Sequence, residues 1–349
     1  MTGSSSESPE ARRLRRLREL GQKDQIRHVN NAVSKVWQQE GGRRPPAIWL
    51  RPGFLIAPRD ESGRHPGPMS RLISSRGVAL RFYLLAVFDA LCRPPSGEPW
   101  RNTRPVSGRR GWADLIAVDA AYSRPARAYQ LGTRQTRTLD TSRARQVQSA
   151  LRQLEELGDQ ALAEVPRKAN GKDRDYAAFL LMKETGRGGE PTPDYYTPGP
   201  SPVHGAVDIP VQFFLNGWVQ LLYPSEIATW LTLRLLRSWF PGQHNEGGVY
   251  LYGKDREDAF GLLRDSYEDS CRSLLEFGLI RRARPTGSVP GDPAVPPTLA
   301  DFFAMASQMM PTVDENGQVR HQANLYQLAD GGLDEQAYPV VLTSVQARL

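Results

Sequence analysis

Cysteine is scarce in this sequence, and its two copies lie far apart along the chain. Cys92 and Cys271 are the only cysteines in 349 residues, and each falls within an apolar helical pattern. So few thiols argue against a disulfide framework and against a cysteine metal site. Two buried, unreactive thiols are the simpler interpretation, and they fit a reducing compartment such as the cytoplasm.

Long apolar runs are also missing. The most apolar stretch, residues 78–92, is interrupted by Arg81 and Asp89 and is too short to span a membrane. The first residues are polar and then basic, without the apolar core of a signal peptide. We therefore expect a cytoplasmic protein that makes no contact with a membrane.

Catalytic and cofactor motifs are the third absence. The sequence has no phosphate-binding loop, no dinucleotide-binding glycine pattern and no nucleophile elbow. None of its five histidines stands three or four residues from another, so no helical metal site is indicated. His321 and Tyr326 match a tyrosine recombinase only faintly, because the accompanying arginine is missing. We therefore expect a protein that is not an enzyme, with no catalytic residues, no metal and no cofactor.

What the sequence does have is an uneven distribution of charge. Residues 1–45 hold 10 Lys+Arg against 5 Asp+Glu, and residues 46–200 hold 24 against 16, whereas residues 201–349 hold 11 against 17. A basic front and an acidic back indicate that one part of the chain meets a polyanion and the other does not. Only six of the 45 basic residues are lysine. Because a bias toward arginine codons can explain the large number of arginines, their positions in the chain are more informative than their number.

Helical patterns and a hairpin follow one another in the first half. Apolar spacing predicts helices over 9–39, 74–91, 112–121 and 142–158. The apolar face of the last helix comprises Val147, Ala150, Leu151, Leu154 and Leu157. Strand-like runs at 161–165 and 176–182 then flank a basic loop with Asn170 and Gly171 at its centre, which predicts a hairpin.

The second half repeats this order. LLYPSEIATWLTLR at 221–234 aligns without gaps on LISSRGVALRFYLL at 72–85. The helix predicted at 264–278 closes with SCRSLLEFG, which matches ALRQLEELG at 150–158. The runs LIRRARP and ANLYQL, separated by a long Pro/Gly insertion, complete a second hairpin. This internal repeat predicts two domains built on one plan.

The order helix, helix, helix, strand, basic hairpin, strand is typical of a winged helix-turn-helix. The chain resembles tandem winged helix-turn-helix DNA-binding proteins, which include two-winged-helix plasmid replication initiators and transcription regulators. The resemblance covers residues 46–185 and 208–330, and it rests on pattern and element order. It implies a mainly α fold with small β wings (α+β), with two winged-helix domains in tandem plus an N-terminal helical arm.

The domain boundaries expected from this plan cover the whole chain. Residues 1–45 form a disordered tip and a basic N-terminal helix, and residues 46–185 form winged-helix domain 1, which binds DNA. Residues 186–207, rich in Pro and Gly, form a linker. Residues 208–332 form winged-helix domain 2, with a dimerisation or accessory role, and residues 333–349 form a C-terminal tail.

Polar and basic side chains gather where a winged helix would meet DNA. Opposite its apolar stripe, the helix at 142–158 offers Arg and Gln, which bond guanine and adenine in the major groove. The hairpin, including Arg167, and the Arg-rich loops before the helix offer contacts to phosphates. The candidate DNA-binding residues are Arg109, Arg110, Arg134, Gln135, Thr136, Arg137, Ser142, Arg143, Arg145, Gln146, Gln148, Ser149, Arg152, Lys168, Asn170, Lys172 and Arg174. Solubilising surface arginines are the alternative interpretation.

The matching helix of the second half has a different outer face. It shows Asp265, Glu268 and Asp269 beside Arg272, and such carboxylates would repel phosphates. We therefore expect domain 2 to dimerise, to dock on domain 1 or to bind a second protein. The arginines at 281, 282 and 284 leave a secondary DNA contact open.

Together these observations favour a sequence-specific double-stranded DNA-binding protein that acts on the nucleoid as a homodimer, most simply as a transcriptional regulator. The first alternative is a replication initiator of a plasmid or mobile element, because it needs the same double-strand binding. The second alternative is a winged-helix protein-interaction adaptor that no longer touches DNA.

Overall fold

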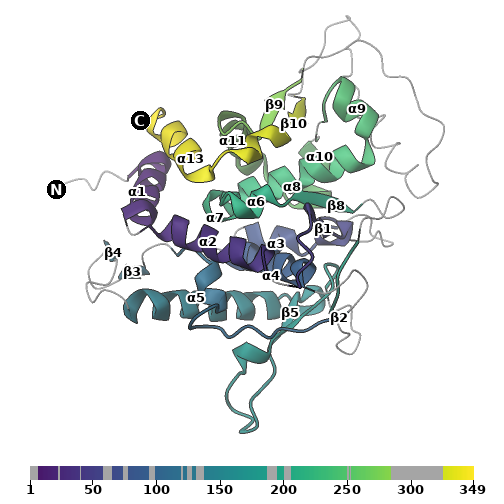
Figure 1. Cartoon of the computed structure of the whole chain (residues 1–349). Helices are drawn as coiled ribbons and strands as arrows, with labels where there is room; N and C mark the ends of the chain where they lie inside the picture. The colour runs from purple at the N-terminus through teal and green to yellow at the C-terminus, as the bar shows by residue number, and fades with distance from the viewer. Residues whose placement is uncertain are drawn as a thin grey trace, which may run out of the picture.

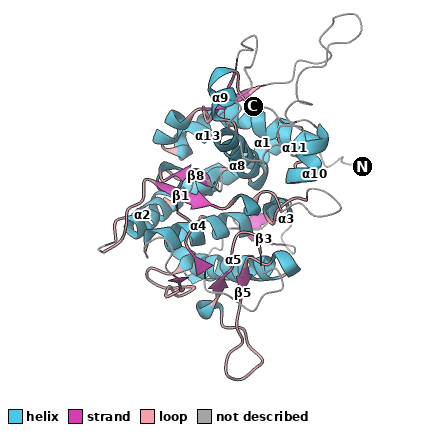
Figure 2. Ribbon diagram, turned by 90° about the vertical axis from the view of Figure 1, so that its right-hand side faces the viewer, coloured by secondary structure: helices cyan, strands magenta, loops and turns pink. Residues whose placement is uncertain are grey.

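The computed structural model describes residues 7–22, 24–39, 41–57, 65–73, 78–93, 99–118, 121–123, 128–130, 137–186, 195–199, 206–249, 251, 253–283 and 325–349. In this part of the chain helices dominate, and the strands form five antiparallel two-stranded sheets (Figures 1 and 2). The expected class, mainly α with small β elements, is therefore confirmed. None of the described helices is both long enough and apolar enough to cross a membrane.

The N-terminal segment folds into two helices where the sequence predicted one. α1 (Pro9–Gln22) and α2 (Gln25–Trp37) meet near Asp24, whose φ of 49° is left-handed and breaks the helical path. Their apolar stripes are buried, with α1 against α13 (Ala337–Gln346) and α2 against α6 (Gln212–Leu215). The two helices therefore belong to the body of the protein and do not extend as an arm (Figure 1).

One buried helix lies at the centre of the first half. The elements are, in chain order, β1 (Ala47–Leu50), η1 (Pro52–Phe54), α3 (Met69–Ile73), α4 (Ala79–Cys92), β2 (Pro99–Trp100), η2 (Trp112–Leu115), β3 (Ala121–Ser123), β4 (Ala128–Gln130), α5 (Arg137–Glu155), η3 (Gly158–Gln160), β5 (Ala163–Glu164), η4 (Tyr176–Ala178), β6 (Leu180–Leu181) and β7 (Tyr195–Tyr196). Every residue of α4 is buried, as expected of a helix that is apolar on all sides. The outer helix α5 packs on α4 and η2, and the β5–β6 hairpin follows it.

The helix predicted at 112–121 is much shorter in the structure. Among the residues of this range that the structure describes, only Trp112–Leu115 are helical, because Ile116 takes an extended conformation with φ −123° and ψ 122°. Trp112 is completely buried and belongs to the hydrophobic core. The residues after it hold the chain close to the second half, as described below.

The second half repeats the outline of the first, with a strand, two short helices, a buried helix, an outer helix and a strand pair, but the elements between its two long helices differ. Its elements are β8 (Val207–Pro210), α6, α7 (Trp218–Leu221), α8 (Pro224–Trp239), α9 (Pro241–Glu246), α10 (Gly253–Phe260), α11 (Arg264–Glu276), β9 (Ile280–Arg282), β10 (Tyr326–Leu328), η5 (Asp330–Asp334) and α13. The outer helix α11 packs on the long buried α8 as α5 packs on α4. Both outer helices are followed by a left-handed glycine, Gly158 at φ 69° and Gly278 at φ 71°.

The two halves share one hydrophobic core. β1 and β8, the first strand of each half, pair antiparallel with Ile48 opposite Ile209. Phe88 of α4 stacks on Phe214 of α6, with ring centroids 4.7 Å apart. The short helices also cross over, because α3 packs on α8 and α7 packs on α4. The interface therefore surrounds the β1–β8 pair, and the outer helices α5 and α11 lie toward opposite ends of the molecule (Figures 1 and 2).

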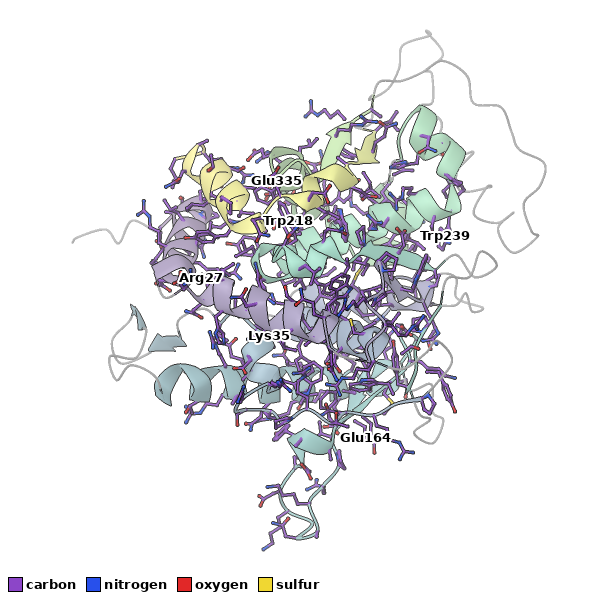
Figure 3. The ribbon with its side chains drawn as sticks, in the orientation of Figure 1. Arg27, Lys35, Glu164, Trp218, Trp239 and Glu335 are labelled. Atoms are coloured by element: carbon purple, nitrogen blue, oxygen red, sulfur yellow. The ribbon has the colours of Figure 1, made fainter. Side chains whose placement is uncertain are left out.

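The segments expected to form a linker and a C-terminal tail both contribute to this body. Within the predicted linker, β7 pairs with β2, and Tyr195 is buried and donates a hydrogen bond to Glu184 at 2.9 Å. The predicted C-terminal tail forms the last two residues of η5 and all of α13. The indole of Trp218 donates to the carbonyl oxygens of Leu333 and Glu335, at 3.3 and 3.2 Å. Figure 3 shows Trp218 in the interior close to Glu335.

Candidate nucleic-acid interface

The outer helix α5 divides into a buried face and an exposed face. Val147, Ala150, Leu151 and Leu154 are buried against α4 and η2, as their spacing predicts. The exposed row on the other side consists of Thr141, Arg145, Ser149, Arg152 and Glu156. Successive members stand three or four residues apart, so they form one continuous strip along the helix. Two of the predicted base-reading arginines, Arg145 and Arg152, lie on this strip.

The other residues predicted to bind DNA in and just before α5 differ in how they are placed. Ser142, Gln146 and Gln148 are half-buried at the edges of the exposed strip. Arg137 is described only as the first residue of α5. The loop residues Arg134, Gln135 and Thr136 lie outside the described residues.

Arg143 is a correction to the predicted interface. Its side chain is buried, and its guanidinium donates to the side-chain oxygen of Gln25 in α2 at 3.4 Å. The reason is the spacing: Arg143 stands four residues before Val147, on the same side of the helix as the apolar stripe. Arg143 therefore attaches α5 to α2, and it is not part of the exposed strip.

The hairpin after α5 projects from the body with a basic tip. Arg167, Lys168, Asn170 and Lys172 are all exposed. The side-chain oxygen of Asn170 accepts hydrogen bonds from the backbone N–H groups of Lys172 and Asp173, both at 3.1 Å. In Figure 1 the loop between β5 and β6 extends beyond α5, and Figure 3 shows Glu164 near the base of this projection. A tight turn thus holds two lysines and an arginine clear of the fold.

The base of the hairpin is attached to the C-terminal end of α5. Glu155 forms an ion pair with Arg174 and accepts a hydrogen bond from the backbone N–H of Val165 at 3.1 Å. The guanidinium of Arg152 lies over the ring of Tyr176, 5.7 Å from its centroid, as in a cation–π contact. Arg174, predicted to bind DNA, is therefore occupied in holding the hairpin to α5. Tyr176 is a contact of the exposed strip that the sequence did not suggest, because aromatic residues in strand-like runs are usually core.

Arg109 and Arg110 lie in the loop that leads into η2. Both are exposed, and the loop turns through Gly108 at φ 87° and Arg110 at φ 65°. The backbone N–H of Arg110 donates to Asp114 at 2.9 Å, and that of Trp112 donates to the carbonyl of Pro105 at 2.9 Å. Because η2 packs on α5, this loop is attached to the same unit as the exposed strip.

Some arginines that raise the basic count are internal. Arg104 is buried and donates to the buried carboxylate of Asp89 at 2.8 Å. Arg13 of α1 is buried in an ion pair with Glu226 of α8, and its guanidinium lies 4.3 Å from the ring centroid of Tyr223. These arginines join segments of the core and are not available to a polyanion. Charge counts from sequence therefore overstate the basic surface.

The outer helix of the second half has an acidic exposed face, as predicted. Asp265, Glu268, Asp269 and Arg272 are all exposed. Arg264 pairs with Glu268 at 2.9 Å, and Arg272 pairs with Asp269 at 3.4 Å. The arginines of α11 are thus matched by carboxylates on the helix itself. α5 and α11 share their position in the repeat but present opposite charge.

The cysteines lie in the core as expected, together with three tryptophans of the second half. Cys92 and Cys271 are buried and unpaired with each other, and burial raises the pKa of the Cys271 thiol to about 12. Trp218 and Trp230 are completely buried, and Trp239 packs partly buried against the same core. In the described part of the chain, no three His, Cys, Asp or Glu side chains gather closely enough to hold a metal ion.

Comparison with protein-family models, with curated proteins and with solved structures gives no match to this chain. The case for a function therefore rests on the residues and geometry of the chain itself.

Proposed function

We propose that the protein binds double-stranded DNA sequence-specifically through its first half, with each half serving as a winged-helix domain. In this proposal the exposed strip of α5 enters the major groove, where Arg145 and Arg152 reach base edges. The β5–β6 hairpin acts as the wing and places Lys168 and Lys172 against phosphates.

One observation carries this proposal. The exposed side of α5, with two arginines and a serine, lies beside a basic hairpin attached to the same helix by Glu155. A reading helix and a phosphate-contacting wing need this arrangement, because the wing fixes the depth and direction of the helix on the duplex. Random surface arginines would not concentrate on one helix strip and on the hairpin that follows it.

The proposed biological role is transcription regulation. Each chain supplies one basic outer helix, because the matching helix α11 is acidic and lies toward the other end of the molecule. A palindromic operator would then require two copies of the chain, in keeping with the expected homodimer.

The test is selection of bound fragments from random duplex DNA by the full-length protein at two salt concentrations, followed by sequencing. We expect an enriched motif and an affinity that falls steeply with salt, because phosphate binding releases counterions. An inverted repeat in the motif would fit a regulator, and a series of direct repeats would fit a replication initiator. Absence of both enrichment and salt dependence would contradict DNA binding and favour the adaptor.

A further inference from the structure

Gln220 belongs to the second half, but its side chain makes its hydrogen bonds in the first half. It lies in α7 and is completely buried. Its side-chain N–H donates to the carbonyl of Leu115 at 2.9 Å, and its side-chain oxygen accepts from the backbone N–H of Ala117 at 3.0 Å. A carboxamide suits this place because it carries one donor and one acceptor group, and the backbone there needs one of each.

The backbone that Gln220 contacts has little access to water. Leu115, Ile116 and Ala117 are all buried, and the extended Ile116 ends the hydrogen bonding of η2. Buried backbone N–H and C=O groups without a partner are costly, so the carboxamide decides where this segment lies. Arg81 of α4 completes the arrangement by donating to the carbonyls of Val219 at 2.9 Å and Ala117 at 3.3 Å.

The segment held by Gln220 continues directly from the loop with Arg109 and Arg110. That loop is rigidly connected to η2, because the backbone N–H of Arg110 and the side chain of Asp114 are hydrogen-bonded at 2.9 Å. A shift at Leu115 would move η2, and with it both arginines relative to α5. The buried stripe of α5 packs on α4 as well as on η2, so a shift of η2 leaves the contact between α5 and α4 in place.

We propose that Gln220 is a positioning residue through which the second half sets the phosphate contacts of Arg109 and Arg110. This inference rests on the proposed DNA binding. The acidic half would then contribute to recognition without touching DNA. It would do so by fixing the position of the loop that carries Arg109 and Arg110.

Gln327 provides a matched control within the same chain. It is also a buried glutamine, and its side-chain N–H groups donate to the carbonyls of His244 and Asn245 at 2.8 and 3.0 Å. Its side-chain oxygen accepts from Arg281 at 2.9 Å. All of these partners lie in the second half, so losing them affects stability without reaching the loop before η2.

The experiment measures DNA affinity against salt concentration for the full-length wild type, Gln220→Met and Gln327→Met, well below their melting temperatures. Each lost phosphate contact lowers the slope of log affinity against log salt by roughly 0.9. We expect Gln220→Met to lose about one to two units of slope and about tenfold in affinity, with Gln327→Met within twofold of the wild type. Partial unfolding would reduce the active fraction without changing the slope. Gln220→Asn, which keeps a donor and an acceptor on a side chain one methylene shorter, serves if Gln220→Met does not fold.

A second comparison separates positioning from a general loss of structure. In a protein with Arg109→Ala and Arg110→Ala, adding Gln220→Met should change the slope no further, because the contacts it would disturb are already gone. An unchanged slope in the Gln220 variants, with wild type bound normally, would overturn the inference alone. A wild type that binds no DNA would overturn the proposed function and the inference together.

Discussion

α5 and α11 occupy the same place in the two halves, yet they present different surfaces to solvent. Each follows a buried helix and several shorter elements, packs on that buried helix, and precedes a left-handed glycine and an antiparallel pair of strands. Their outer residues are Arg145, Ser149 and Arg152 in one case and Asp265, Glu268 and Asp269 in the other. The buried pattern preserves the shape of the unit, while the exposed positions are free to change its electrostatics. The comparison teaches that architecture alone does not assign a function to a helix.

The largest expected effect tests whether the two halves are one folding unit. Phe88→Ala removes a completely buried ring that stacks on Phe214 across the halves, and we expect it to lower the free energy of unfolding by about 3–5 kcal/mol. Chemical denaturation should show one transition, shifted as a whole, in both fluorescence and circular dichroism. Two separate transitions, with only one of them shifted, would show that the halves are independent and would break the comparison.

A smaller effect is expected at the exposed strip of α5. Arg145→Ala or Arg152→Ala should weaken binding to the selected DNA site by about 1–3 kcal/mol if the side chain contacts bases. Binding to unrelated duplex should fall much less. Fluorescence anisotropy with both DNAs measures the difference, and an equal loss on the two DNAs would move these arginines from base contacts to phosphate contacts.

The wing should show the opposite behaviour. Lys168→Ala or Lys172→Ala should weaken binding to all sequences alike and should lower the salt slope by about one. Both lysines are exposed near a turn fixed by Asn170, so the substitutions should leave the melting temperature unchanged. A loss confined to the selected sequence would instead place the wing in contact with bases.

The smallest expected effect is a pH dependence located in the second half. Burial lowers the pKa of His244, and its Nε2 accepts a hydrogen bond from the backbone N–H of Leu328 at 2.8 Å, which requires the neutral ring. The unfolded chain then binds a proton first, so stability is complete above about pH 6.5 and falls as the pH drops below it. Denaturation between pH 7.5 and 5.5 should show this decline, and His244→Gln should reduce it.

The sequence predicted features that depend on local periodicity. The apolar stripe of α5, the burial of α4 and the repeat of elements all follow from residues close together in the chain. The β1–β8 pair could not be foreseen, because its two strands lie in different halves and each is only four residues long. The hydrogen bonds of Gln220 could not be predicted for the same reason, since its partners lie in the other half.

Two other differences involve single residues. The spacing of Arg143 to Val147 places it on the buried side of α5, whereas its charge alone favours an exposed position. The break between α1 and α2 depends on the left-handed conformation of Asp24, which Asp adopts more readily than most residues but which sequence does not require. Local patterns therefore predicted the elements, whereas their pairing and the use of buried polar groups required the tertiary structure.

The most direct test of the central claim compares matched arginine pairs on the two outer helices. Arg145→Ala with Arg152→Ala removes two positive charges from α5, and Arg264→Ala with Arg272→Ala removes two from α11. Binding of both variants to the selected DNA is measured at two salt concentrations. We predict a loss of affinity of tenfold or more for the α5 variant only, at both salt concentrations, with the α11 variant like the wild type. Equal losses in the two variants, or a loss confined to α11, would contradict the assignment of DNA binding to the first half.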